Sequence, residues 1–454
     1  MSFWNLDRIA AALGDYDGQK APRPSVEITG INTDSRTVAA GQVFVALAGE
    51  NFDGHDYVQS AVEKGAVAVV VSKNFDTASL GVPAFKVGDT LVALGQLASF
   101  WRAVWGKPIV MIAGSNGKTT TKDLVRAALS SELRVHATSG NLNNRIGVPL
   151  TLLSIPQDAE IAVVEAGTNL PGEVATLRAI IDPDISVVTS VGEEHLEGLG
   201  DLEGVLKEEA AAFDGVRVAI TPSAQPEIAE AAKDRAREVV TAGLEAGDVT
   251  PTSWEISPDG RGSLVLDDVP LKLPLRGLHN MRNAMLAIAV ARVCGVADEN
   301  SAKGIGEMPV PRMRTAWEEI GKATLINDAY NANPGSTRAA IDLIRNVGSD
   351  RQRVIVLGTM RELGEASDKC HDDISRLALD SGADVIAGVG EFATSLARVA
   401  GNDSRVVSAA TVEELWPLLV PRLQKNAVIL LKASRGVKLE QMVPHITTWA
   451  NSWC

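Results

Sequence analysis

The sequence predicts a multidomain α/β protein whose sheets are mainly parallel, and three observations support this class. The chain has 454 residues, enough for about three domains of common size. Short apolar runs recur along it, each followed by a stretch of helical character, as in parallel sheets buried on both faces. Hydrophobic residues make up 45% and charged residues 22%, which is typical of globular chains and excludes a fibrous or disordered protein.

The predicted strands fall into three groups along the chain. In the first third they span residues 43–47, 66–72 and 83–87. In the middle third they span residues 108–113, 134–137, 160–165, 185–191 and 217–221. In the last third they span residues 323–327, 353–357, 383–388 and 427–432. Residues 253–276 differ, because a Pro-Asp-Gly-Arg-Gly turn and alternating leucines predict a hairpin at the edge of the middle domain.

Proline and glycine mark two predicted linkers. Trp105-Gly106-Lys107-Pro108 is the first, and Met308-Pro309-Val310-Pro311 is the second, because two prolines so close together stop regular structure. They divide the chain into predicted domains at residues 1–107, 108–311 and 312–454.

Composition excludes several classes of function. Lys and Arg number 43 against 57 Asp and Glu, so the net charge of −14 argues against nucleic-acid binding. No apolar stretch reaches the roughly 20 residues of a membrane span, and the first residues lack the pattern of a signal peptide. The three cysteines are widely separated and form neither a disulfide framework nor a metal-binding spacing. A cytoplasmic protein is therefore expected.

The sharpest motif is a predicted phosphate-binding loop. An apolar strand, residues 109–113, leads into Gly114-Ser115-Asn116-Gly117-Lys118-Thr119-Thr120 and then a helix. Glycines let backbone N–H groups surround a phosphate, Lys118 reaches the β- and γ-phosphates, and the Thr119 hydroxyl can bind Mg²⁺. The strict motif also expects a glycine where Ile112 stands, so this is a shorter variant. The alternative is a turn and helix cap that carries these letters by chance.

Two polar residues follow predicted strands of the middle domain. Glu165 ends one strand, and His195 comes shortly after the next one. Ligands of open α/β sheets bind beyond the carboxyl ends of the strands, and a carboxylate there can hold Mg²⁺. The alternative is a solvated glutamate and a surface histidine.

Asparagines gather in two segments. Residues 140–149 follow a strand, and their Asn and Arg side chains could bind amide and carboxylate groups; a capped turn is the alternative. Asn280 and Asn283 share one face of an apolar helix at spacing i, i+3, and the alternative there is that Asn280 caps the helix.

The last third carries three polar clusters. Residues 311–314 form a small basic cluster. Residues 326–336 follow a strand; Asn333-Pro334 is a good helix start, but Asp328, Tyr330 and Asn331 need another explanation. Lys432, Arg435 and Lys438 come just past a strand and predict an anion site, with a solvated face as the alternative.

Together these segments resemble the Mur ligases. The matching segments, in chain order from Asp34 to about Glu440, are GSNGKTTTK, GNLNNRIGVPLTLL, VVEAGTN, HLEGLG, GLHNMRNA, PRMR, INDAYNANPGS and LLKASRGVKLE. DAYNANP together with GNLNN and HLEG resembles the branch that uses D-alanyl-D-alanine. The short phosphate loop is shared with other Mur ligases and with folylpolyglutamate synthetases.

The resemblance implies three domains: an N-terminal domain for the UDP-linked substrate, a central ATP-binding domain and a C-terminal Rossmann-like ligase domain. It implies an ATP-dependent amide ligase of peptidoglycan precursor synthesis that works through an acyl phosphate. ATP and Mg²⁺ are the implied cofactors, and UDP-N-acetylmuramoyl-tripeptide and D-alanyl-D-alanine the implied substrates. A cytoplasmic monomer is expected, without nucleic-acid or membrane partners.

The resemblance also assigns residues to roles. It places at the UDP-linked substrate Ser35, Arg36, Asn141 and Asn144. It places at ATP Gly114, Ser115, Asn116, Gly117, Lys118, Thr119, Thr120, Asn280, Asn283, Arg314, Asp328 and Asn331. It places at the metal ions Thr119, Glu165, His195 and Glu209. The implied catalytic residues are Lys118, Glu165 and His195, and the implied acceptor-side residues are Lys432, Ser434 and Arg435.

The chain departs from the family pattern at two positions. Four residues before Phe213 the family has a lysine, usually carbamylated, where this chain has Glu209. We expect Glu209, in the helix register set by Phe213, to supply the carboxylate directly, with Lys207 as the competing candidate. The alternative is a weakened second metal site, with Glu209 a surface residue of a charged helix. The family's GDMxELG has Thr359 in place of the aspartate. Two alternatives stay open: a sister ligase with another amino acceptor, and a nucleotide-binding protein without turnover.

Overall fold

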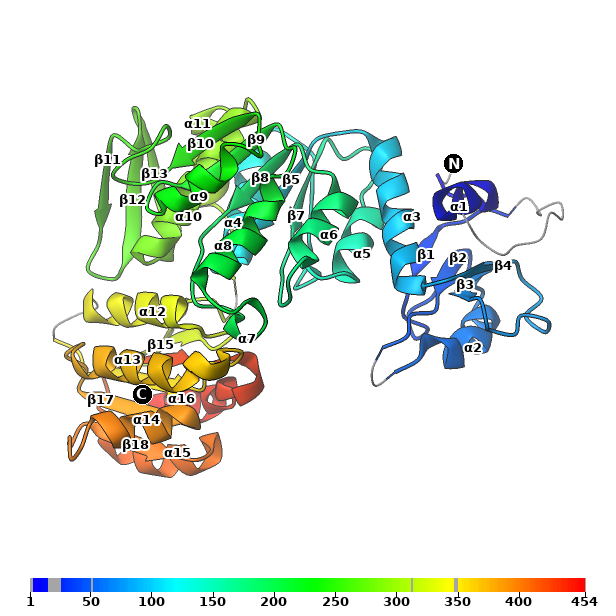
Figure 1. The fold of residues 1–454 in the computed structure, drawn as a ribbon. Coiled ribbons are helices and arrows are strands. Elements are labelled where there is room, and N and C mark those ends of the chain that lie inside the picture. Colours follow the sequence, from blue (N-terminus) through cyan, green and yellow to red (C-terminus); the bar gives the residue numbers. More distant parts are fainter. Residues whose placement is uncertain (1–2, 15–25, 50–51, 312, 347–349, 454) are drawn as a thin grey trace. The chain divides into compact units, whose positions relative to one another are not determined.

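The computed structural model describes residues 3–14, 26–49, 52–311, 313–346 and 350–453 (Figure 1). Arg312 of the predicted basic cluster and Cys454 lie outside these residues. The contacts divide the chain into two compact units: Met1–Met111, Leu133–Thr168 and Gly172–Ile185 in one, and Ile112–Glu132, Asn169–Pro171 and Ser186–Cys454 in the other. The predicted domain boundaries after residues 107 and 311 stay predictions.

The N-terminal region is a parallel sheet with helices. Its strand order is β1-β2-β3-β4, with bounds Gly30–Asn32, Gln42–Val45, Ala68–Ser72 and Ala84–Val87. The helices are α1 (Leu6–Leu13), α2 (Val58–Glu63) and α3 (Thr90–Trp105). The three predicted strands are confirmed, whereas β1 has only three half-buried residues and no apolar run that could have predicted it.

The central sheet has the strand order β10-β9-β8-β5-β7-β6. The strands are β5 (Ile109–Ala113), β6 (Val135–Ala137), β7 (Ile161–Glu165), β8 (Ile185–Val188), β9 (Val218–Pro222) and β10 (Glu238–Ala242). The helices are α4 (Lys118–Leu129), α5 (Gly147–Leu153), α6 (Glu173–Ile181), α7 (Leu196–Leu199), α8 (Leu202–Ala210) and α9 (Pro226–Ala232). All five predicted strands are confirmed; β10 was missed because it is mostly half-buried and mixes polar with apolar residues.

Residues 253–276 form a separate antiparallel sheet of three strands. The sequence predicted a two-stranded hairpin here, so the prediction had one strand too few. The strands are β11 (Ser253–Ile256), β12 (Arg261–Leu266) and β13 (Val269–Arg276). A second turn at Asp267, which has a positive φ of 52°, adds the extra strand. Helices α10 (Leu278–Val293) and α11 (Asp298–Gly306) follow, and both contact α4.

The C-terminal region holds a six-stranded sheet of order β14-β15-β19-β16-β17-β18. The strands are β14 (Ala316–Ile320), β15 (Ala323–Asp328), β16 (Arg353–Gly358), β17 (Val385–Val389), β18 (Val406–Ala409) and β19 (Val428–Lys432). The helices are α12 (Pro334–Asn346), α13 (Ser367–Leu379), α14 (Glu391–Val399), α15 (Val412–Leu419) and α16 (Met442–Asn451). Strand β14 pairs antiparallel with β15, and the other neighbouring strands of this sheet are parallel.

Alternating side chains of β19 supply two apolar cores, one on each face of this sheet. Ile429 and Leu431 belong to one core, and Val428 and Leu430 to the other. Burial on both faces explains why this strand, like β15, β16 and β17, appears in the sequence as an apolar run. The predicted α/β class with parallel sheets is confirmed.

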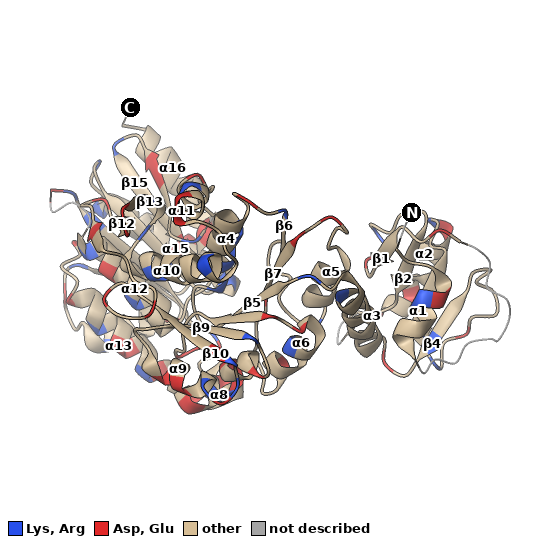
Figure 2. Ribbon diagram, turned by 90° about the horizontal axis from the view of Figure 1, so that it is seen from above, with Lys and Arg blue, Asp and Glu red and all other residues tan. Residues whose placement is uncertain are grey.

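Charged residues of both signs are distributed along the helices of the chain (Figure 2). In Figure 2, Lys and Arg are interspersed with Asp and Glu along the helices. None of the helices within the described residues has both the length and the apolar character needed to cross a membrane.

Candidate active site

The phosphate loop leaves the buried strand β5 through a residue that only glycine can occupy. Gly114 has a φ of 116°, and a Cβ there would collide with the side chain of Thr189. The Thr189 hydroxyl donates to the Asn116 carbonyl at 2.6 Å, and the Ser115 N–H donates to the Ser190 carbonyl at 2.8 Å. The loop is therefore fastened to the segment after β8. Gly117, with a φ of 84°, precedes the first residue of α4.

Lys118 lies inside this loop. Its Nζ donates to the carbonyl oxygens of Gly114 at 2.5 Å and Ser115 at 3.2 Å, and it lies 3.7 Å from Glu194 Oε2. An ammonium held by the loop at the start of a helix is suited to bind phosphate oxygens, because the helix dipole adds partial positive charge. This placement agrees with the role that the sequence predicts.

Glu209 is buried beneath the loop. Its Oε2 accepts a 2.7 Å hydrogen bond from the Gly114 N–H, and the residue is only 2% exposed. Burial raises the pKa of this carboxyl to about 7, although the positive charge of Lys118 opposes the rise. Lys207 on the same helix is exposed. Glu209 thus faces inward and Lys207 outward, as the register set by Phe213 predicts, while a metal-binding role of Glu209 stays a prediction.

His195 connects two carboxylates. Its Nδ1 lies 2.5 Å from Glu362 Oε2, and its Nε2 lies 3.3 Å from Glu194 Oε1. Burial alone would lower the pKa of His195, but the hydrogen bonds and charges of these two glutamates raise it to about 9. Sequence reasoning missed both glutamates. Their positions in the sequence could have indicated them, because Glu194 adjoins the HLEG segment and Glu362 lies in the GDMxELG-like segment.

Glu165 ends β7 and is almost fully buried, at 2% exposed. Its Oε1 accepts a 2.9 Å hydrogen bond from Asn143 Nδ2, and its backbone N–H donates to Thr138 Oγ1. The surface glutamate considered as an alternative is therefore excluded. Asn143 itself was not singled out by the sequence.

The other predicted residues of this unit have simpler surroundings. Asn144 Oδ1 accepts the N–H groups of residues 146 and 147, which is the capped turn considered as an alternative. Asn141 is exposed. The exposed Arg36 donates to Asp34, and its hydrogen bonds lower the pKa of Asp34 to about 2. The Ser35 carbonyl accepts from Lys64 Nζ at 2.7 Å.

Asn280 and Asn283 are buried on α10 beside the loop. Asn280 Nδ2 donates to the Arg276 carbonyl at 2.8 Å, so Asn280 does not cap the helix, which begins after Gly277. Asn283 Nδ2 donates to Asn280 Oδ1 at 3.3 Å. A Cβ on Gly117 would lie 2.8 Å from Asn283 Oδ1. The structure thus places Asn283 directly against the phosphate loop.

The polar residues after β15 and β19 form a second cluster. Lys432 Nζ lies 2.7 Å from Asp328 Oδ2 and also donates to the Asn331 carbonyl. The Arg314 guanidinium lies 4.2 Å from the centre of the Tyr330 ring, a cation–π contact. The parallel strands β15 and β19 are neighbours and end at one edge of the sheet, which brings these distant segments together.

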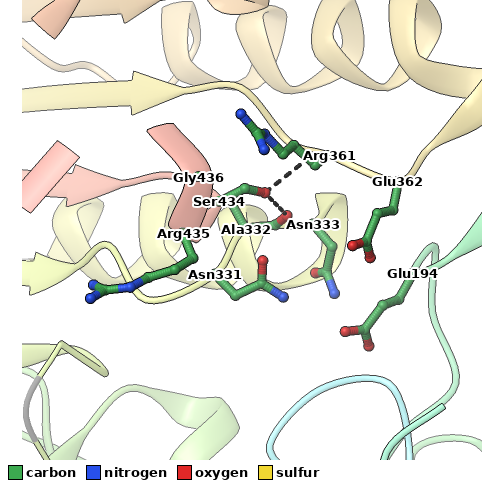
Figure 3. A pocket seen from close by; sticks show the side chains of 9 residues that line it. All are labelled: Glu194, Asn331, Ala332, Asn333, Arg361, Glu362, Ser434, Arg435 and Gly436. Carbon is green, nitrogen blue, oxygen red and sulfur yellow. Dashed lines mark hydrogen bonds between the residues drawn. The ribbon is translucent and has the colours of Figure 1, made fainter. Parts of the chain in front are cut away.

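A pocket of ≈ 170 Å³ lies beside this cluster (Figure 3). Its lining comprises Glu194, Asn331, Ala332, Asn333, Arg361, Glu362, Ser434, Arg435 and Gly436. Ser434 Oγ donates to the Ala332 carbonyl and accepts from the Arg361 N–H. Of the predicted residues, Asn331, Ser434 and Arg435 line this pocket, whereas Lys432 is buried and is not part of its lining.

Two contacts bring the pocket next to the phosphate loop. Asn333 Nδ2 donates to Asn116 Oδ1 at 2.8 Å, and Glu194 lies between Lys118 and His195. Chemically, the arrangement can hold a small polar ligand beside a bound phosphate.

The predicted metal ligands are compatible with Mg²⁺ in part. No group of three or more His, Cys, Asp or Glu side chains suited to a metal occurs among the described residues. Mg²⁺ bound with a nucleotide needs only one or two carboxylates besides phosphates and water. Each taken by itself, the carboxylate of Glu165 and the hydroxyl of Thr119 are groups of the kind that Mg²⁺ binds, and their roles stay predictions. Both ring nitrogens of His195 face carboxylates, so His195 fits only if one of these carboxylates moves away.

The chain matches known proteins along most of its length. Residues 27–102 match the Mur ligase family catalytic domain, residues 112–291 the Mur ligase middle domain, and residues 312–435 the Mur ligase, glutamate ligase domain. It is 34% identical over 424 residues to the UDP-N-acetylmuramoyl-tripeptide–D-alanyl-D-alanine ligase of Bacillus subtilis, covering 92% of each chain. It is 32% identical to the Escherichia coli ligase of the same name, covering 92% of this chain and 93% of that one.

Solved structures show the same likeness. A crystal structure of MurF from Acinetobacter baumannii superposes with a TM-score of 0.90 at 31% identity, over 98% of this chain and 99% of that one. MurF from Thermotoga maritima in complex with ADP superposes with a TM-score of 0.83 at 24% identity, which shows a shared fold.

Proposed function

Because the chain belongs to the Mur ligase family, we propose that it joins D-alanyl-D-alanine to UDP-N-acetylmuramoyl-tripeptide with conversion of ATP to ADP and phosphate. The main observation behind this proposal is the hydrogen bond between Asn116 of the phosphate loop and Asn333 of the polar pocket. This contact supports a nucleotide site that lies beside a site for a small polar acceptor.

The reaction requires that the nucleotide site and the acceptor site lie next to each other. A carboxylate is a poor acyl donor, so one of its oxygens first attacks the γ-phosphorus and ADP leaves. The neutral amine of the dipeptide then attacks the carbonyl carbon. The amide forms as the nitrogen gives up a proton to solvent and phosphate leaves with the former carboxylate oxygen and the electron pair. Lys118 and the loop N–H groups stabilise the charge that develops on the phosphoryl oxygens. Exclusion of water protects the reactive intermediate from hydrolysis.

We assign Lys118, Glu165 and His195 to catalysis, and the loop residues 114–120 to ATP. Thr119, Glu165, His195 and Glu209 would hold the two Mg²⁺ ions, which supply charge stabilisation at the phosphates. Glu209 has a further task, since its bond to the Gly114 N–H holds the loop itself.

The remaining assignments concern the substrates. For ATP they comprise Asn280, Asn283, Arg314, Asp328 and Asn331. For the UDP-linked substrate they comprise Ser35, Arg36, Asn141 and Asn144. For the acceptor they comprise Lys432, Ser434 and Arg435.

We also propose three domains, at residues 1–107, 108–311 and 312–454, and a monomer that acts in the cytoplasm. The matched family segments, residues 27–102, 112–291 and 312–435, support these boundaries. Nucleotide-linked substrates and the lack of a disulfide framework in the sequence support the compartment.

The test is a phosphate-release assay with a panel of UDP-linked peptides and amino acceptors. The proposal expects release only when ATP, the UDP-linked tripeptide and D-alanyl-D-alanine are all present. Release with another acceptor alone would identify a sister ligase. ATP binding without release under any combination would identify a protein that has lost turnover.

A further inference from the structure

The pocket in Figure 3 has opposite charges at its two ends. The side chains of Arg361 and Arg435 extend toward one end, while the carboxylates of Glu194 and Glu362 lie at the other. A zwitterionic dipeptide also carries opposite charges at its ends, about 7 Å apart when it is extended. A dipeptide of one orientation therefore matches the charges of the pocket.

The two arginines differ in whether their guanidinium groups already form an ion pair. Arg435 Nη1 pairs with Glu440 Oε1 at 2.9 Å, so its charge is partly neutralised. Arg361 is exposed, and no ion pair of its guanidinium occurs within the part of the chain that the structure describes. Arg361 is thus the cation available to an incoming carboxylate.

The position of Arg361 is fixed by its backbone. Its N–H donates to Ser434 Oγ at 3.0 Å, and Ser434 in turn donates to the Ala332 carbonyl. The guanidinium lies over Gly436, where any Cβ would collide with it. The segment after β16 and the segment after β19 together place this cation at the pocket.

The acidic end of the pocket is the end nearer to the phosphate loop. Glu194 Oε2 lies 3.7 Å from Lys118 Nζ, and Glu194 Oε1 lies 3.3 Å from His195. An acceptor amine held at this end is directed toward the place where an acyl phosphate would form. The reverse orientation would direct a carboxylate, which cannot form the amide.

We propose that Arg361 binds the C-terminal carboxylate of the incoming dipeptide, so that its amino end points toward Glu194, Glu362 and the phosphate loop. This inference rests on the proposed function, because it specifies how that acceptor is recognised. Guanidinium and carboxylate form paired, charge-assisted hydrogen bonds, which makes Arg361 a residue that selects acceptors with a free carboxyl end.

The test compares D-alanyl-D-alanine with its C-terminal amide in the wild-type enzyme and in Arg361→Gln. The wild type should use the amide with a kcat/KM roughly 10- to 100-fold lower, the effect expected for a lost charged hydrogen-bond pair. In Arg361→Gln the two acceptors should become nearly equal, through a higher KM for the free dipeptide, while the KM values for ATP and the UDP-linked tripeptide stay unchanged. Arg376→Gln, an exposed arginine of α13 paired with Asp373, is the matched control and should keep the wild-type preference.

Two outcomes would overturn the proposal and are distinguishable from each other. If the wild type forms the amide bond with D-alanyl-D-alanine but Arg361→Gln keeps the full preference for the free carboxylate, the assignment of Arg361 is wrong and the proposed function stands. If the wild type releases no phosphate with the dipeptide, the proposed function fails, and the orientation fails with it.

Discussion

Asn333, just before α12, donates from Nδ2 to Oδ1 of Asn116 in the phosphate loop, at 2.8 Å. The other end of the same amide is also used, since Asn333 Oδ1 accepts the Ser336 N–H at 2.8 Å. One side chain therefore caps a helix of the C-terminal region and also hydrogen-bonds the phosphate loop. The two hydrogen bonds of this side chain should therefore have separate effects, one on the KM for ATP and one on stability.

We expect Asn333→Ser to keep the helix cap but lose the bond to Asn116, because a serine hydroxyl can cap a helix but is too short to reach the loop. The KM for ATP should rise roughly 2- to 10-fold, as for the loss of one neutral hydrogen bond. Asn333→Ala should show the same KM and lose a further ~1 kcal/mol of unfolding free energy. Steady-state kinetics and urea unfolding check both; an unchanged KM in both variants would show that the contact does not matter for ATP.

Replacement of Lys118 should abolish turnover without unfolding the protein. Its ammonium donates to two carbonyl oxygens of the loop and lies near the Glu194 carboxylate, so we expect it to act through its charge more than through packing. We expect Lys118→Ala to lower kcat by roughly 10²-fold or more. Lys233→Ala, an exposed lysine paired with Glu230, is the matched control. A folded Lys118→Ala protein with near-normal kcat would contradict the assignment of this loop.

Activity should not depend on bicarbonate, because Glu209 already supplies a buried carboxylate where a lysine would need CO₂ to make one. Removal of CO₂ and addition of bicarbonate should leave the rate unchanged. Glu209→Ala leaves the buried Gly114 N–H without its acceptor, so it should lower the unfolding free energy by about 1–3 kcal/mol and slow turnover. Lys207→Ala should be nearly silent. Bicarbonate-dependent activity that is lost in Lys207→Ala but kept in Glu209→Ala would show that the register is wrong.

His279, in the first turn of α10, should make the protein sensitive to mild acid. Burial of the ring, despite the nearby Asp328 carboxylate, lowers its pKa from 6.5 to about 4. His279 as a whole residue is only partly buried. The pKa depends on the surroundings of the ring, because the ring carries the charge. Because the unfolded chain then binds more protons, stability is lost as the pH falls from 6.5 toward 4.

At pH 5 this loss amounts to up to about 2 kcal/mol. His279→Gln cannot gain the proton, so its unfolding free energy should fall less than that of the wild type between pH 7.5 and pH 5. Urea unfolding of both proteins at the two pH values is the measurement, and equal losses in both would show that His279 does not titrate in this way.

Much of the fold followed from apolar runs, because strands buried on both faces must be apolar throughout. Strands at the sheet margins escaped prediction for the complementary reason: β14 begins Ala316-Trp317-Glu318-Glu319, and β10 carries Glu238 and Thr241. Such strands are partly exposed and need no apolar run.

The residues of the candidate site also divide into those that the sequence predicts and those that it does not. Lys118 and its loop were predictable because neighbours in the chain make the phosphate cradle. Glu362 and Arg361 were not, since they gain their meaning from His195 and Ser434, which lie far away in the sequence. Charge alone does not reveal a partner that only the tertiary fold supplies.

The central claim is that a carboxylate is activated by phosphorylation and then attacked by an amine. The most direct test places oxygen-18 in the terminal carboxylate of the UDP-linked tripeptide and follows the label by mass spectrometry during turnover with ATP and D-alanyl-D-alanine. The account predicts that the released phosphate carries one labelled oxygen from the carboxylate for each amide formed. Phosphate without this label, although amide accumulates, would contradict the acyl-phosphate route.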